Sequence, residues 1–232
     1  MLFSKKMRIF VANYLDSTSK PNAMIKIETH PTDSQLTGQS KWWGEPDMPD
    51  NLDYPEVTVS EDDDTWKDPL TFVCQIRCED IAALDPEGVL PHNGMLYFFA
   101  ALDYFLGDID APSYPSMGIW QPDYFCVLYS PSCENLHTHH IVNADNTPAS
   151  LPAEAITFSA CHENGDGIRL LGTPYIEEVC EEMPGMLSLL QIDESDRWNL
   201  TFHDCGTLNF LISPDALKNR QWEKAQCYLF SF

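Results

Sequence analysis

Dense apolar runs recur along the chain and predict β-strands. Residues 94–102 are almost continuously apolar, which is typical of a strand covered on both faces. Residues 70–76 and 124–130 have a similar character. Residues 24–29 instead alternate apolar and polar side chains, the pattern of an edge strand. The first half of the chain is therefore expected to be rich in β-structure.

The second half repeats this character with short helices between strands. Its predicted strands are residues 187–192, 198–202, 207–212 and 226–232. Short helices are expected over residues 78–84, 176–183 and about 214–223. Ser213 would cap the last of these, with Pro214 in its first turn.

Three other stretches give weaker signals. Residues 7–15 fit a strand or a short helix, and residues 16–22 fit a loop. Residues 44–68 contain three prolines and the acidic run at 61–64. This composition predicts an exposed loop.

Four short blocks occur twice in the same order, once in each half. The paired segments are 44–46 with 172–174, 72–76 with 188–192, 93–99 with 205–211, and 126–130 with 227–231. We therefore expect an α+β fold of mainly antiparallel β-sheets, in which a β-rich half-unit is duplicated and short helices connect the strands. Residues 1–232 would form a single domain, with repeat halves at about 40–130 and 168–232.

The charge balance disfavours nucleic acid as a ligand. The chain has 36 acidic against 13 basic residues, a formal net charge of -23, so a polyanion would be repelled. No Lys or Arg lies between Arg77 and Arg169. This interval is either a solvated acidic surface that aids solubility or a surface that meets a basic protein.

Cysteine usage and hydropathy indicate a cytoplasmic protein with reduced thiols. The eight cysteines have neither the density of a disulfide scaffold nor the spacing of a zinc ribbon. No apolar run approaches the length needed to span a membrane, and the N-terminal stretch lacks a signal-peptide cleavage site.

The histidine cluster is the one candidate for a metal site. His137 and His139 would share a face if they lay on a strand, with His140 beside them. A third ligand of characteristic spacing is missing. A polar hairpin or loop is the simpler interpretation, and we predict no metal and no cofactor.

Six further residues are candidates for binding. Trp42 and Trp43 precede the acidic stretch and could be interface anchors, or they could pack beneath it as core. Asp62, Asp63 and Asp64 form its acidic centre. Asp204 is a candidate lining residue of a cleft.

Two glutamines stand at matching positions of the repeat. Gln75 and Gln191 each lie inside an apolar strand, where a buried amide needs hydrogen-bond partners. They are expected to bond the backbone of the Gly-x-Pro loops, at 44–46 and 172–174, or a neighbouring strand edge; a role in facing a ligand is the alternative.

Several motifs together resemble the YwqG-like family of uncharacterised bacterial proteins. They are SKWWGEP at 40–46, LTFVCQI at 70–76, GMLYFF at 94–99, LLGTP at 170–174, LLQID at 189–193 and DCGTLNF at 204–210. Asn209 departs from the pattern, because an aromatic residue is common there. The resemblance implies a duplicated cytosolic α+β fold without an established activity or cofactor. Family members occur near polymorphic-toxin genes, which implies an immunity role.

Two functions follow as hypotheses. The first is a protein-binding module, such as an immunity-type inhibitor that covers a basic toxin or effector. The second is an enzyme or small-molecule binder with a cleft between the half-units, lined by Trp43, Gln75, Gln191 and Asp204. Catalysis is not favoured, because the chain has no nucleophile elbow, phosphate-binding glycine loop, zinc-protease motif or dinucleotide fingerprint.

Overall fold

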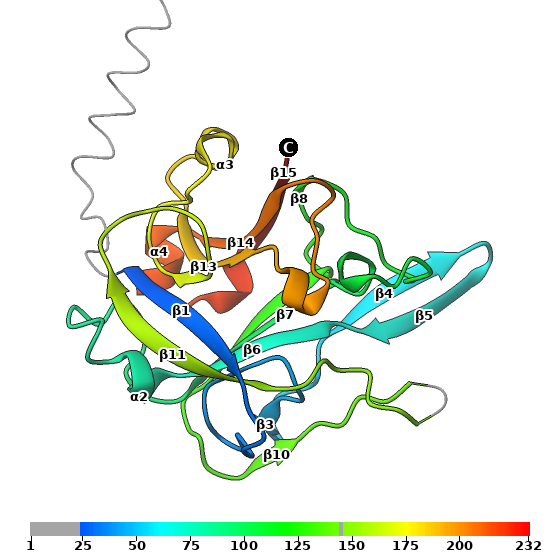
Figure 1. The fold of residues 1–232 in the computed structure, drawn as a ribbon, viewed down its shortest axis with the longest axis horizontal. Coiled ribbons are helices and arrows are strands. Elements are labelled where there is room, and N and C mark those ends of the chain that lie inside the picture. The colour runs from blue at the N-terminus through cyan, green and yellow to red at the C-terminus, as the bar shows by residue number, and fades with distance from the viewer. Residues whose placement is uncertain (1–23, 144–145) are drawn as a thin grey trace, which may run out of the picture.

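One large antiparallel sheet dominates the structure. The computed structural model describes residues 24–143 and 146–232. In these residues the sheet has eleven strands and is curled into a half-barrel around the main core (Figure 1). Its spatial order is β8 (Gly118–Ile119), β15 (Gln226–Ser231), β14 (Gly206–Ile212), β13 (Leu187–Asp193), β12 (Arg169–Leu170), β1 (Met24–Pro31), β11 (Glu154–Cys161), β2 (Lys41–Trp42), β6 (Thr71–Arg77), β7 (Met95–Ala100) and β9 (Phe125–Ser130).

Two small sheets and several short helices complete the described part. β3 (Asp47–Pro49) pairs with β10 (Leu136–Thr138), and β4 (Glu56–Glu61) pairs with β5 (Asp64–Pro69). The α-helices are α2 (Cys78–Ile81), α3 (Glu177–Glu182) and α4 (Pro214–Lys218), and the 3-10 turns are η1 (Tyr104–Leu106), η2 (Asp196–Trp198) and η3 (Trp222–Lys224). The fold is thus mainly antiparallel β, with less helix than the expected α+β class implies.

The large sheet has an internal pseudo-symmetry about its central pair, β1 and β11. On one side the order runs β11, β2, β6, β7, β9, and on the other it runs β1, β12, β13, β14, β15. β6 and β13 have the same burial pattern, and each carries an irregularity after its second residue. This correspondence supports an internal duplication.

The strand register refines the alignment of the repeats. Phe98 and Phe210 occupy matching positions, and they face Val127 and Cys227 respectively. Val127 is therefore the counterpart of Cys227. The fourth repeated block, aligned by sequence as 126–130 with 227–231, is displaced by one residue.

A tight turn explains why the repeat contains glycine. Trp43 and Gly44 both have positive φ, 54° and 77°, and so do Leu171 and Gly172 in the other half, 61° and 117°. A Cβ on Gly44 would lie 2.7 Å from the Ala153 Cβ. Glycine is thus required both by the backbone conformation and by the close approach of another segment.

The core forms because the curled sheet brings the two halves face to face. β7 is fully buried: Leu96 and Phe98 point into the main core, whereas Tyr97 and Phe99 point into a second cluster on the outer face. The Phe98 ring lies 5.3 Å from that of Phe210 in β14, edge to face. Aromatic contact of this geometry adds to the energy of burial.

The connections also cross between the halves. β8 comes from the segment between β7 and β9, yet it covers the edge of β15, where Ile119 pairs with Tyr228. In return, η3 comes from the segment between β14 and β15 and packs on β9, with the Trp222 ring 5.9 Å from Tyr129. Each half therefore protects the outer strand of the other.

A buried polar network surrounds Asp47 in the first half. One carboxylate oxygen, Oδ2, accepts hydrogen bonds from Lys41 Nζ at 2.8 Å, the Gly38 amide at 2.9 Å and Gln75 Nε2 at 3.0 Å. Oδ1 accepts from the Thr138 hydroxyl at 2.7 Å. Burial raises the pKa of Asp47, but the hydrogen bonds from Lys41, Thr138 and Gly38 outweigh it, so that the pKa is lower than usual.

The two glutamines perform equivalent structural tasks. Gln75 donates to the Gln39 carbonyl at 2.8 Å and accepts from the Asp47 amide at 2.8 Å. Gln191 donates to the carbonyls of Gly165 and Gly167 at 3.1 and 2.9 Å. Both amides therefore have a structural role with backbone partners, as expected, but these partners lie outside the Gly-x-Pro loops at 44–46 and 172–174.

Most predicted elements are present. The strands expected at 70–76, 94–102, 124–130, 187–192, 207–212 and 226–232 are confirmed, as are the three short helices, the last of which is interrupted. Ser213 caps α4, and its hydroxyl accepts from the Ala216 amide at 3.2 Å. Residues 7–15 and 16–22 lie outside the described residues.

Three predictions are wrong. Residues 24–29 are not an edge strand, because β1 pairs on both sides, with β11 and β12. Residues 44–68 are not a loop, since they contain β3, β4 and most of β5. The strand expected at 198–202 is replaced by η2 and an irregular segment, because Trp198 turns into the core.

We predict that Asp47→Asn lowers the free energy of unfolding by about 3–5 kcal/mol, because it leaves the Lys41 ammonium buried without its counter-charge. Urea denaturation at neutral pH measures the change. The exposed Asp204→Asn serves as control and should stay within about 0.5 kcal/mol of the wild type. An Asp47 variant as stable as the control would contradict a structural role for this ion pair.

The same variant should also change the response to acid. Because the folded protein lowers the pKa of Asp47, its stabilising contribution is complete above the unfolded value of about 4 and is lost as the pH falls through the folded value. The stability difference between wild type and Asp47→Asn should therefore shrink below about pH 4.

Candidate functional site

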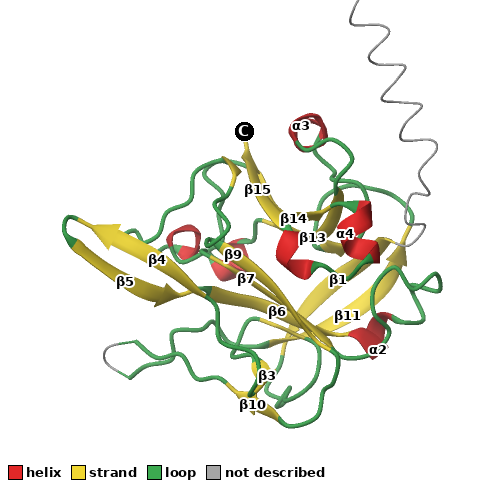
Figure 2. Ribbon diagram, turned by 180° about the vertical axis from the view of Figure 1, so that it is seen from behind, coloured by secondary structure: helices red, strands yellow, loops and turns green. Residues whose placement is uncertain are grey.

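A two-stranded arm projects from the body of the protein and carries the candidate site. It consists of β4, β5 and the turn between them, residues 56–69, and we call it the acidic arm (Figures 1 and 2). β4 alternates strictly: Val57 and Val59 are buried against the second cluster, whereas Thr58 and Ser60 are exposed. The two valines anchor the arm to the body through one face of β4, whereas Asp64 to Lys67 of β5 are exposed.

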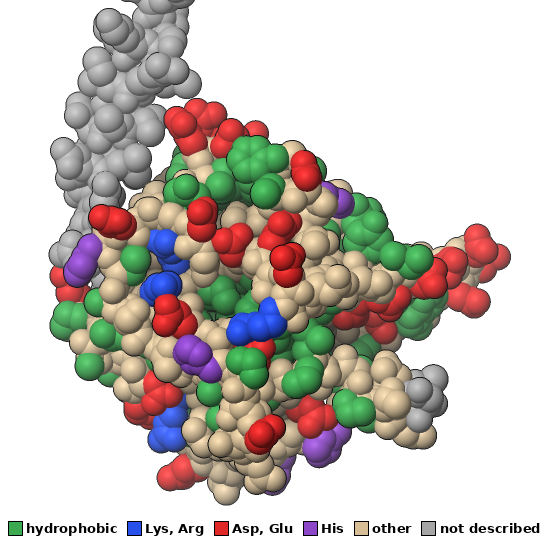
Figure 3. Space-filling view, viewed as in Figure 1, with side chains coloured by type: hydrophobic (Ala, Val, Ile, Leu, Met, Phe, Trp, Pro, Cys, Tyr) green, Lys and Arg blue, Asp and Glu red, His purple; other side chains and the backbone are tan. Residues whose placement is uncertain are grey.

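The tip of the arm concentrates negative charge. Glu61 pairs with Asp64 across a two-residue turn formed by Asp62 and Asp63, and all four side chains are exposed. Asp62 adopts a left-handed φ of 51°, which Asp tolerates better than most residues. Figure 3 shows the carboxylates gathered at the outer end of the arm.

The charge at the tip is not neutralised within the protein. Among the described residues, none of these four carboxylates forms an ion pair. Lys67, the one cation of the arm, pairs instead with Glu56 near the base, at 3.5 Å. The tip therefore presents an unbalanced negative field to solvent.

Further carboxylates lie at the base of the arm. Burial raises the pKa of Asp68, and the negative charges of Asp103 and Asp108 raise it further. Burial also raises the pKa of Asp103; the hydrogen bond from the Thr71 hydroxyl, 2.6 Å, opposes this and Asp108 adds to it. Ionising these groups together costs energy, which a cationic partner would recover.

An exposed tryptophan lies between the two acidic regions. Trp66 is 37% exposed and pairs with Val59 across the arm. In β5 it stands two residues from Asp64 and two from Asp68, so the three side chains share a face, the same face that Val57 and Val59 occupy in β4. The arm thus combines an aromatic contact surface with flanking carboxylates.

The other tryptophan candidates are core residues. Trp42 and Trp43 are 0% and 1% exposed, so the hypothesis that they are surface anchors is wrong and the core alternative holds. Both rings contact Trp198, at 5.7 and 5.4 Å. Trp198 donates its indole N–H to the Glu154 carboxylate at 2.9 Å, which fixes the position of its ring against the other two.

The four residues expected to line a cleft are not brought together. Trp43, Gln75 and Gln191 are buried, whereas Asp204 is exposed. Four strands separate β6, which carries Gln75, from β13, which carries Gln191. The hypothesis of a cleft lined by these residues therefore has no geometrical support.

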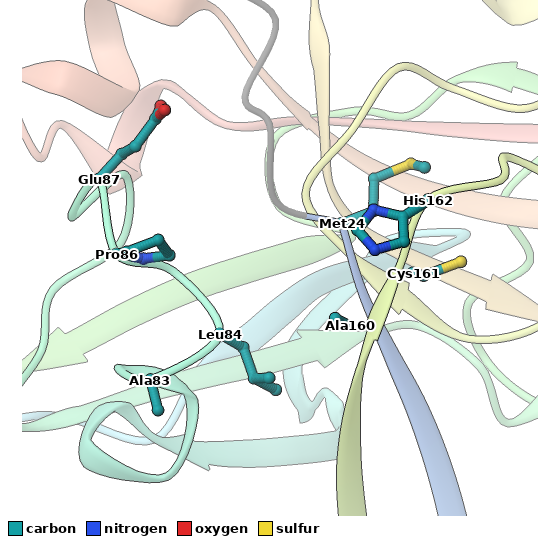
Figure 4. Close-up of a pocket in the computed structure, with 8 residues that line it drawn as sticks. All are labelled: Met24, Ala83, Leu84, Pro86, Glu87, Ala160, Cys161 and His162. Carbon is teal, nitrogen blue, oxygen red and sulfur yellow. The ribbon is translucent and has the colours of Figure 1, made fainter.

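A pocket of about 280 Å³ does exist elsewhere (Figure 4). The loop after α2 forms one side, and the ends of β1 and β11 form the other. Its lining residues are Met24, Ala83, Leu84, Pro86, Glu87, Ala160, Cys161 and His162. The pocket lies just below the usual size range of small-molecule sites and contains none of the predicted candidates.

The histidine cluster is spread over separate acidic partners. His137 Nε2 lies 3.5 Å from an Asp50 carboxylate oxygen, and His140 Nδ1 lies 2.9 Å from one of Glu45. The His139 ring lies 6.3 Å from that of Tyr54. In residues 24–143 and 146–232, no group of three or more His, Cys, Asp or Glu side chains is arranged to hold a metal ion.

The family model DUF1963, a domain of unknown function, matches residues 40–165 and 157–229. The chain belongs to this family. The two matched segments suggest the same duplication as the sheet order, because they divide the chain near β11. No curated protein matches the chain.

The described part of the chain contains no helix of sufficient length and apolar character to cross a membrane.

The charge run at 61–64 identifies the acidic tip, whereas no sequence pattern alone identifies the rest of the site. Interpreting residues 44–68 as a loop gives Trp66 and Asp68 no defined face, and Asp103 comes from a segment distant in the sequence. The alternation of Val57 and Val59 with polar residues was the signal that would have revealed a strand and placed Trp66 on it.

We predict that Asp68→Asn raises the free energy of unfolding at pH 7, by less than about 1 kcal/mol because water screens this half-exposed group. A raised folded-state pKa means that ionisation above it costs stability, so the neutral side chain removes that cost. Below about pH 3, where wild-type Asp68 is protonated in both states, the two proteins should unfold alike. Urea denaturation at both pH values measures this, and a loss of stability at pH 7 would show that Asp68 makes a stabilising contact instead.

Proposed function

We propose that this protein is a binding module for a basic protein and that the acidic arm is its contact element. The observation that carries the proposal is the set of exposed carboxylates at the tip, Glu61 to Asp64, which have no cation beside them among the described residues. Such a set raises the rate at which a positively charged partner is captured.

The distribution of charge in the rest of the protein supports this function. With 36 acidic and 13 basic residues, the whole molecule attracts cations, and the arm extends that field beyond the body. At its base, burial and neighbouring negative charges raise the pKa values of Asp68 and Asp103, because they oppose ionisation. A nearby positive charge would stabilise the ionised form of both carboxylates. A basic protein satisfies both regions at once.

The proposal includes a cellular role. The YwqG-like resemblance points to an immunity-type inhibitor that covers a basic toxin or effector. A cytoplasmic location agrees with the eight cysteines, all of which are unpaired. An inhibitor of this kind needs a rigid body and an accessible charged element, and the curled sheet with its arm provides both.

We predict that the triple variant Asp62→Asn, Asp63→Asn, Asp64→Asn loses its partner while remaining folded. The matched control is Glu177→Gln, Glu178→Gln, Glu181→Gln on α3, where the same number of exposed carboxylates is neutralised far from the arm in the sequence. Tagged proteins are used to capture partners from the native host at low and at moderate salt.

The wild type and the α3 variant should recover one stoichiometric basic protein, and the arm variant should not. The association rate, measured with the purified partner, should fall more than the unfolding free energy changes. Recovery of no basic protein, or equal recovery by all three proteins, would contradict the proposed function.

A further inference from the structure

β5 is an exposed strand with an unpaired edge. In the described residues β4 and β5 pair with each other and with no other strand. An antiparallel strand bonds its neighbour through alternate residues, so the remaining N–H and C=O groups of β5 point outward, away from β4. These groups can pair with a strand from another chain.

The two strands of the arm differ in exposure. In β4, Val57 and Val59 are 1% and 7% exposed, because they pack on the second cluster. In β5, Asp64 to Lys67 are exposed, and Asp68 and Pro69 are partly buried. Consecutive residues of β5 are thus in solvent on both faces of the strand, whereas β4 packs one face on the body, so an incoming strand finds room beside β5.

One face of β5 has a defined chemical pattern. Asp64, Trp66 and Asp68 alternate along it, acidic, aromatic, acidic. Residues of a neighbouring strand lie about 4.5–5.5 Å from those directly opposite, which is contact distance for side chains. A matching strand would carry basic, apolar and basic residues at alternate positions.

We propose that an extended basic segment of the partner adds to the arm as a third strand beside β5, with basic residues opposite Asp64 and Asp68 and an apolar residue opposite Trp66. This inference rests on the proposed function and states how the partner is recognised. Main-chain hydrogen bonds supply affinity, and the alternating side chains supply specificity.

The acidic residues of the arm also have an explanation that does not involve strand addition. Acidic residues on an exposed edge also prevent pairing between copies of the same protein. If that were their whole role, basic peptides would be attracted to the arm without regard to their backbone or to the order of their residues. The experiment must therefore separate strand pairing from electrostatic attraction.

The test uses labelled synthetic peptides with the full-length protein. The first peptide has arginine, valine and arginine alternating with threonine. The second has the same sequence with alternate backbone amides N-methylated, which keeps every charge but blocks strand pairing. The third has the same composition in a scrambled order.

Fluorescence anisotropy should show that the first peptide binds and that methylation weakens binding about tenfold or more, since losing one or two ordinary hydrogen bonds amounts to that factor. Scrambling should also weaken binding. Hydrogen exchange of the wild-type protein should show new protection at the amides of residues 64–68 in β5 that point away from β4, and not at β4. This readout needs no mutation.

In addition, the Trp66→Ala variant should bind the first peptide more weakly than the wild type does, whereas the Glu178→Gln variant on α3 should bind it equally well.

The outcomes separate this inference from the proposed function. Equal binding of the methylated and unmethylated peptides, without protection of β5, would overturn strand addition and leave an electrostatic contact at the arm. Failure of every peptide to bind would also overturn strand addition, and the partner capture described above then decides the proposed function independently.

Discussion

The pairing of β1 with β11 is the constraint on which the architecture depends. This ladder runs over eight residue pairs, from Met24 with Cys161 to Pro31 with Glu154, and it joins the two repeated sets of strands into one sheet. Without it, each set would end in an open edge and expose the apolar face of its central strand. With it, the sheet curls and Phe98 meets Phe210 across the core. The two repeated sets of strands are thus held together by the strand pair at the centre of the sheet.

The two halves support the same backbone arrangement around their glutamines with different charged side chains. Lys41 and Arg169 hold matching positions opposite the two glutamines. Lys41 pairs with the buried Asp47, whereas Arg169 donates to backbone carbonyls, among them that of Glu163 at 2.6 Å. The matching glutamines keep their bonds to the preceding loop in both cases. The backbone arrangement is therefore retained while the charge that supports it has diverged.

The sequence predicts the parts of this fold that depend on local pattern. The nearly continuous apolar run at 95–100 identifies β7, because both faces of that strand are buried. β11 could not be predicted, since its mixed side chains reflect a half-exposed position between other strands. The same limit applies to the candidate site. Asp62 to Asp64 stand out as a charge run, whereas the neighbourhood of Asp68 and Asp103 arises from tertiary packing of distant segments.

The acidic arm belongs to the part of the chain that the pseudo-symmetry does not explain. Residues 43–70 connect β2 with β6 and contain β3 and the arm, whereas the corresponding connection from β12 to β13, residues 171–186, is shorter and contains only α3. Elements common to both halves, such as Gln75 and Gln191, maintain the sheet. The acidic arm is found in one half and is not needed to maintain the sheet. The carboxylates at its base carry an electrostatic cost that folding alone does not require. Residues that reduce stability in isolation are expected where a partner supplies the missing charge. The asymmetry between the halves, together with this cost, is the physical reason to locate function in the arm rather than in the duplicated sheet.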